Sequence, residues 1–92
     1  MKYYLISYDL RSQGQNYSAL YDEIKAYGDF KHPMESTWII RVPDSISPVS
    51  VRDKLQSKMD SNDSVLVVDI SSSTYAGYLP TTFWDWFKQE NK

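Results

Sequence analysis

Hydrophobic and polar positions along the chain predict four strands. The apolar and aromatic runs lie at residues 3–9, 30–34, 36–42 and 65–70. The first and last runs carry large side chains on both parities, so both faces of these strands are expected to be covered. Pro33 cannot donate to a ladder, so the second strand is expected at an edge or with a bulge. Trp38, Ile40 and Val42 share one parity of the third strand, and Trp38 is predicted to lie in the core.

Two segments between these strands have helical spacing. Asn16 is predicted to cap the first helix, and Gly28 is its expected stop. Ser47 and Pro48 form a start signal for the second helix, with an N-cap serine followed by proline at the first helical position. The apolar positions are Tyr17, Leu20, Tyr21, Ile24 and Tyr27 in the first helix, and Val51, Leu55 and Met59 in the second.

The order of these elements is β-α-β-β-α-β, which predicts an α+β, ferredoxin-like fold with an antiparallel sheet. In this topology the first and third strands are central and the last lies at an edge. An apolar edge strand left bare is a liability, so the tail or another protomer is expected to cover residues 65–70. We expect a single domain over residues 1–92, with a core at 1–70 and a tail at 71–92.

The tail carries two further expected elements. Residues 75–79 are predicted to form a short fifth strand. A C-terminal helix is expected after Pro80, with Phe83, Trp86 and Phe87 on one face. A short amphipathic helix must dock on something to be stable, either on the core of its own protomer or on a partner.

The charge balance and the content of cysteine and histidine exclude several classes of protein and of site. The 92 residues include 10 basic and 12 acidic side chains, for a net charge of −2, so the chain as a whole is no electrostatic clamp for nucleic acid. Absence of cysteine excludes a disulfide scaffold and a Cys nucleophile, and a single histidine excludes a multi-His metal site. No apolar run approaches the roughly 20 residues of a membrane span, so we expect no membrane partner and a cytoplasmic location.

Aromatic residues are unusually frequent. Eight Tyr, three Trp and three Phe are more than one small core can hold. Tyr and Trp are favoured at interfaces, which predicts a homodimer. Base stacking is the alternative use of exposed aromatic rings.

Asp9 is the first candidate for chemistry, because it stands at the C-terminal end of the first strand, where such folds tend to place ligands. One carboxylate is a weak ligand for Mg²⁺, but a two-fold axis near Asp9 would supply a second. The alternative is a turn-forming aspartate that accepts hydrogen bonds from the loop amides of residues 11–13.

Short motifs resemble a known family. Tyr8-Asp9-Leu10 resembles the Tyr-Asp-Ile start of Cas2-type proteins, the small CRISPR-associated dimers. Residues 34–38 are similar to the Gln-x-Ser-Val-Phe segment of that family, with Thr for Val and Trp for Phe. The likeness in layout covers roughly residues 3 to 80.

The resemblance implies a ferredoxin-like dimer with a fifth strand that crosses to the partner's sheet. It also implies that Asp9 of each protomer holds Mg²⁺ for phosphodiester hydrolysis. Arg11 would then contact the phosphate, with Ser36 as a minor hydrogen-bonding partner. Cas2 proteins also serve as a scaffold for the integrase, and related VapD-type toxins are ribonucleases. The departure is that Arg11 stands alone where the family usually has several basic residues.

Two functions stay open at this point, and so does the question of enzymatic activity. The first is a Cas2-like dimer acting as a weak metal-dependent nuclease or as a scaffold that binds RNA or DNA, with Asp9, Arg11 and Ser36 at its site and Mg²⁺ as cofactor. The second is a non-catalytic dimeric module of phage or mobile-element origin that binds another protein through its aromatic C-terminal segment.

Overall fold

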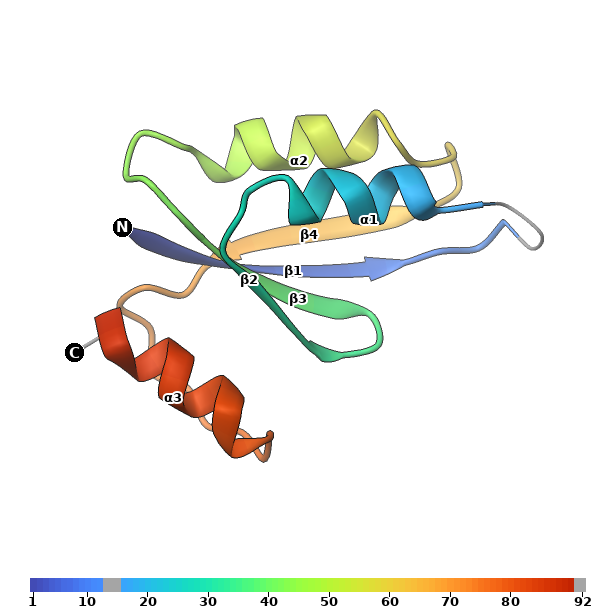
Figure 1. Ribbon diagram of the computed structural model, residues 1–92. Helices are drawn as coiled ribbons and strands as arrows, with labels where there is room; N and C mark the ends of the chain where they lie inside the picture. Colours follow the sequence, from blue (N-terminus) through green and yellow to red (C-terminus); the bar gives the residue numbers. More distant parts are fainter. Residues whose placement is uncertain (13–15, 91–92) are drawn as a thin grey trace.

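The computed structural model describes residues 1–12 and 16–90, and for residues 89 and 90 it describes the backbone. Over these residues the chain forms a four-stranded antiparallel sheet and three helices, which confirms the α+β class (Figure 1). The elements are β1 (Lys2–Asp9), α1 (Ser18–Lys25), β2 (Phe30–Met34), β3 (Thr37–Val42), α2 (Pro48–Gln56), β4 (Ser64–Asp69) and α3 (Thr81–Glu90). Within the described residues, no helix has the length and apolar character needed to cross a membrane.

The strand order in the sheet is β2-β3-β1-β4, so the first and third strands are central and the last lies at an edge, as predicted. Residues directly opposite each other in neighbouring strands share a face of the sheet. Tyr4 therefore shares the first face with Ile40, while Leu5 shares the second face with Ile39 and Val68.

Helices α1 and α2 cover the first face (Figure 1). The prediction that Trp38 lies in the core is confirmed, because it is buried there together with Ile40 and Val42. The whole cluster of buried side chains comprises Tyr4, Ile6, Tyr8, Leu20, Ile24, Trp38, Ile40, Val42, Val51 and Leu55.

The helix ends follow the local signals with small differences. Helix α1 begins at Ser18, so Tyr17 and not the predicted Asn16 holds the N-cap position, although the Ser18 backbone N–H donates to Asn16 Oδ1 at 2.9 Å. Gly28 has a φ of +90°, a conformation that side-chain-bearing residues rarely adopt, which explains glycine after this helix. At α2 the Ser47 side chain accepts from the Ser50 N–H at 3.1 Å, as predicted for an N-cap.

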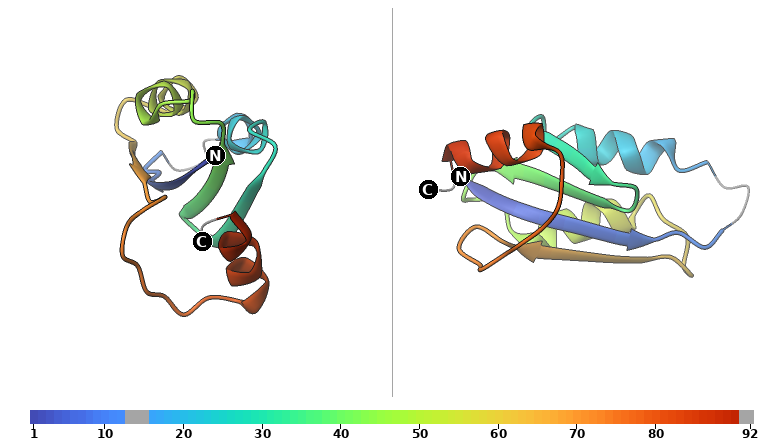
Figure 2. Two further views of the ribbon diagram at one scale, coloured as in Figure 1. Left: turned by 90° about the vertical axis from the view of Figure 1, so that its left-hand side faces the viewer. Right: turned by 90° about the horizontal axis from the view of Figure 1, so that it is seen from below.

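Helix α3 covers part of the second face of its own sheet (Figure 2). Phe83 and Phe87 are buried against Tyr3 and Ile39, and the Tyr3 and Phe87 rings meet edge to face at 4.8 Å. The expected helix is therefore present, and of its two expected docking places it occupies the sheet of the same chain.

A polar contact fixes α3 at the end of β3. The Asp29 carboxylate accepts from Trp86 Nε1 at 2.7 Å and forms an ion pair with Arg41 Nη1 at 2.6 Å. One side chain thus links the helix to the sheet. We call this group of Asp29, Arg41 and Trp86 the α3 contact.

The prediction of a fifth strand at residues 75–79 is wrong, because the described residues 73–80 contain no strand. The side chain of Tyr75 stacks on Trp84 at 6.0 Å and meets Phe87 edge to face at 4.9 Å. The segment therefore gains its packing from α3 and not from a strand ladder.

The prediction that β4 is buried on both parities is also wrong. Leu66 is 61% exposed and Val68 is 38% exposed on the second face. Helix α3 lies over the β3 side of that face, on Tyr3 and Ile39, and β4 forms the opposite border of the sheet (Figure 2).

Candidate functional site

The end of β1 lies beside the turn between β2 and β3. The Tyr8 N–H donates to the Ser36 carbonyl at 3.1 Å, which holds the two segments together. Asp9 and Ser36 consequently line one hollow of about 200 Å³, together with Tyr8, Leu10, Tyr21 and Glu35. We call this the strand-end hollow. Two of the three site residues that the sequence suggests therefore line the same hollow.

The third, Arg11, forms an ion pair with Asp9. Its Nη2 lies 2.8 Å and its Nε 3.0 Å from Asp9 Oδ2. Both side chains are exposed, so the pair contributes little to stability. The ion pair matters for metal binding, because the Arg11 guanidinium already donates two hydrogen bonds to one oxygen of the Asp9 carboxylate.

The alternative hypothesis was that the Asp9 carboxylate accepts hydrogen bonds from the backbone N–H groups of residues 11–13. For residues 11 and 12 it is wrong. The Arg11 N–H donates to Asp63 Oδ1 at 2.8 Å, and the Ser12 N–H donates to Tyr17 Oη at 3.3 Å. Gln13, the remaining residue of that expectation, lies outside the described residues. Asp63 takes the place that the sequence suggested for Asp9, because its carboxylate reaches this loop from the turn before β4.

Asp63 is a residue that reasoning from sequence missed. Besides the Arg11 N–H, its carboxylate accepts from Tyr17 Oη at 2.8 Å and from the Asp60 N–H at 2.9 Å. Burial raises the pKa of Asp63, but the hydrogen bonds outweigh this effect and the pKa is lowered. Asp63 thereby fixes the loop that carries Arg11. Its one sequence signal is its place in the turn-forming run 60–64.

A Mg²⁺ site within one chain does not fit these residues. In residues 1–12 and 16–90, no three His, Cys, Asp or Glu side chains are grouped so that they could hold a metal ion. Asp9 contributes one carboxylate, and Arg11 occupies one of its oxygens. Mg²⁺ usually takes one or two carboxylates together with phosphate oxygens and water. A metal at Asp9 would therefore have one carboxylate from this chain, with Oδ1 as the oxygen that Arg11 does not contact, and a second carboxylate would have to come from another copy.

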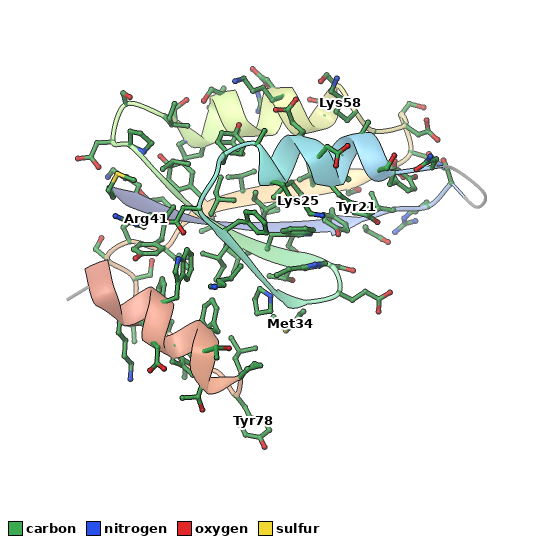
Figure 3. All side chains as sticks on the ribbon, in the orientation of Figure 1. Tyr21, Lys25, Met34, Arg41, Lys58 and Tyr78 are labelled. Atoms are coloured by element: carbon green, nitrogen blue, oxygen red, sulfur yellow. The ribbon has the colours of Figure 1, made fainter. Side chains whose placement is uncertain are left out.

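Aromatic side chains form the wall next to the strand-end hollow. The His32 ring stacks on Trp38 at 3.7 Å, and Trp38 Nε1 donates to Tyr8 Oη at 3.0 Å. Burial raises the pKa of Tyr8, so its hydroxyl stays protonated at neutral pH. Because His32 covers one face of the buried Trp38, this indole is not available as a platform for a base. Tyr21 and Lys25 of α1 border the same wall (Figure 3).

A second hollow lies on the other side of the sheet, and we call it the apolar groove. It measures about 360 Å³. Met34 at its rim is 51% exposed, and Tyr78 is 102% exposed and points away from the molecule (Figure 3). None of the described residues that line it is charged. The lining comprises Leu5, Pro33, Met34, Thr37, Ile39, Ile70, Tyr75, Ala76, Gly77, Tyr78, Leu79, Phe83, Trp84 and Phe87.

Comparison of the chain with protein-family models, with curated proteins and with solved structures finds no match.

Proposed function

We propose that the chain is a Cas2-like, ferredoxin-like homodimer that acts as a non-catalytic module for binding another protein. The element order from β1 to β4, with the first and third strands central, supports the ferredoxin-like assignment. Helix α3 is an addition to that plan. The short motifs around Asp9 and at residues 34–38 support the Cas2-like assignment.

The apolar groove is the observation that carries the proposal. A hollow of about 360 Å³ falls within the size range of binding pockets, and its lining is aliphatic and aromatic. Large exposed apolar patches on soluble proteins often mark interaction sites. Tyr78 stands fully exposed at the rim, where a tyrosine offers an apolar ring and a polar hydroxyl to a partner. A neutral, apolar side chain from another protein fits this lining best.

A random peptide library displayed on phage tests the proposal. We expect the wild-type chain to enrich peptides with closely spaced apolar side chains. The enriched peptides should lose at least tenfold in affinity for the variant Met34→Glu with Tyr78→Ala. They should keep their affinity for Gln56→Glu, an exposed position on α2. Failure to enrich any peptide, or equal binding to all three proteins, would contradict the proposal.

A Mg²⁺-dependent nuclease at Asp9 is the second candidate. It is favoured by the shared hollow of Asp9 and Ser36 at the end of β1. In this candidate Asp9 of two copies would hold the metal, while Arg11 would leave Asp9 for a phosphate and Ser36 would donate a hydrogen bond to it. The single-chain geometry and the net charge of −2 weigh against strong activity.

A cleavage assay separates the two candidates. RNA and DNA substrates are incubated with Mg²⁺, Mn²⁺ or EDTA at about 0.15 M salt, where exposed charges are largely screened. The binding proposal expects cleavage at background level for wild type, Asp9→Asn and Asp53→Asn alike. Metal-dependent cleavage by wild type and Asp53→Asn that disappears in Asp9→Asn would replace the binding proposal with the nuclease.

A further inference from the structure

The two edges of the sheet differ in their protection against pairing. Strand β2 carries Lys31 and Pro33, and its register with β3 shifts between Lys31 and Met34. Charged residues, proline and bulges are the usual means of blocking an edge. Strand β4 has none of these in the run from Ser64 to Val68, and it pairs with β1 without a shift over six pairs of residues. In the described part of the chain, no strand pairs with the outer side of β4.

Apolar side chains flank this open edge on both faces of the sheet. Leu66 and Val68 are exposed on the second face. On the first face Val49 of α2 is 55% exposed, and it lines a hollow of about 210 Å³ together with Val65 and Val67. A strand added at β4 would therefore bury apolar surface above and below its backbone.

The ladder with β1 fixes which backbone groups of β4 point outward. The Ile70 N–H donates to the Tyr3 carbonyl at 2.9 Å. Backbone hydrogen bonding alternates along a strand, so every second residue counted back from Ile70 directs its N–H and C=O groups toward β1. Val65, Val67 and Asp69 have the opposite parity. Their N–H and C=O groups point away from the sheet and are available to another strand.

We infer that β4 pairs antiparallel with β4 of a second copy, about a two-fold axis at Val67, so that two sheets join edge to edge. This inference rests on the homodimer of the proposed function and names its interface. Leu66 then lies opposite the partner's Val68, and Val65 lies opposite the partner's Asp69. The exposed apolar residues of each copy cover those of the other, as an isologous interface requires.

Two other registers, with the axis at Leu66 or at Asp69, are less favourable. An axis at Leu66 would set Val68 opposite the partner's Ser64, and an axis at Asp69 would set the two Asp69 carboxylates opposite each other. Like charges directly opposite in a sheet are destabilising. The axis at Val67 uses all three outward-pointing residues and keeps the carboxylates apart.

Sedimentation equilibrium on the full chain tests the interface with two matched variants. Leu66 and Met34 are both exposed apolar residues on β-strands, at opposite edges of the sheet. We expect wild type and Met34→Lys to be dimers at tens of micromolar, and Leu66→Lys to be a monomer. Its dissociation constant should rise at least a hundredfold, because a lysine would face the partner's Val68.

Cross-linking tests the register. Opposite residues at a non-hydrogen-bonded antiparallel position have Cα atoms about 4.5 Å apart, within the range that a disulfide spans. The chain has no cysteine of its own. An oxidised equal mixture of Leu66→Cys and Val68→Cys should give mainly the mixed disulfide dimer, in higher yield than either variant alone.

The outcomes are distinguishable. A monomeric wild type overturns the homodimer and this interface with it. A dimer that persists in Leu66→Lys but is lost in Met34→Lys overturns this interface and places the dimer at the apolar groove. A dimer that persists in both variants overturns it as well. A dimer lost in Leu66→Lys with like-residue disulfides dominating overturns the register.

Discussion

Trp38 connects the core to the strand-end hollow through one side chain. Its ring is buried beneath α1, stacks with His32, and donates from Nε1 to Tyr8 Oη. Alternation along β3 predicted its burial. The hydrogen bond to Tyr8 was beyond the sequence, because it depends on the register of two strands that lie 30 residues apart in the chain.

Trp38→Ala should lower the free energy of unfolding by about 3–5 kcal/mol, as expected for a large aromatic side chain removed from a core. Trp38→Phe keeps a ring in place and should cost less than the alanine variant. Urea denaturation followed by circular dichroism measures both. A loss below about 1 kcal/mol for Trp38→Ala would mean that the indole does not pack as described.

Asp63 gives a pH dependence whose sign can be worked out. A carboxylate whose pKa is lowered by folding stabilises the folded state above its ordinary value of about 4, and this contribution is lost as the pH falls through the lowered value. We expect Asp63→Asn to melt below wild type at about pH 7 and to lose less of its Tm on going to about pH 3.

The control for Asp63 is Asp53→Asn, which removes a carboxylate that accepts from the adjacent Arg52 on the surface of α2. Its Tm should follow that of wild type across the same pH range. If Asp63→Asn ran parallel to wild type, the hydrogen bonds to Arg11, Tyr17 and Asp60 would not carry the stabilisation assigned to them.

The ends of the helices and the irregularity of β2 could be predicted because each depends on residues that are close together in the sequence. The N-cap at Ser47, the stop at Gly28 and the proline of β2 are local, and the structure has the corresponding ends and shift. The fifth strand failed because a strand requires a partner edge, which residues 75–79 do not by themselves specify. The exposure of β4 depends on where α3 docks, and this too is a property of distant segments.

In the candidate site too, local sequence signals identified single residues, whereas contacts between distant segments could not be predicted. Asp9 was suggested by its place at a strand end, and Ser36 entered through the family resemblance. Their common hollow follows from the pairing of β1 with β3. Asp63 was missed because its partners Arg11 and Tyr17 lie 52 and 46 residues away.

The α3 contact is expected to stabilise the docking of helix α3 on the sheet. Trp86→Phe keeps an aromatic ring beside Tyr3 but removes the hydrogen bond to the Asp29 carboxylate, which should cost about 1–2 kcal/mol. Hydrogen exchange should show faster exchange of α3 amides with little change in α1 and α2. Trp84→Phe is the control, since Trp84 packs on Tyr75 and takes no part in the α3 contact.

If Trp86→Phe left the protection of α3 unchanged, the aromatic packing of Phe83 and Phe87 would by itself account for docking. If the amides of all three helices exchanged faster together, α3 would unfold with the whole molecule and not as a separate unit.

For the whole molecule, the sheet carries a hydrophobic cluster on each face, and its surface still exposes apolar side chains at β4 and at the apolar groove. Edge-to-edge pairing at β4 would place the two Asp9 residues far apart, since Asp9 lies opposite Ser64 at the end of β4. The two carboxylates would then not share a metal ion. The interface and the non-catalytic proposal are thus consistent with each other.

Thermal unfolding of the whole molecule should depend on protein concentration. Association of folded chains stabilises them by mass action, so the Tm of wild type should rise by roughly 3 °C or more for each tenfold increase in concentration. Scanning calorimetry between about 1 and 100 µM covers the range in which a micromolar dimer dissociates. The Tm of Leu66→Lys should stay constant, and a constant wild-type Tm would contradict a dimer in this range.

The proline and the register shift of β2 have a consequence for assembly size. A sheet with two open edges could add copies at both ends and grow into a fibre of indefinite length. The proposed pairing at β4 would use the open edge of each copy, and the outer edges of the resulting pair would both be β2, whose proline and register shift disfavour further addition. Growth would therefore stop at two chains, and the hydrophobic run of β4 that could otherwise promote aggregation would form a contact that limits its own size.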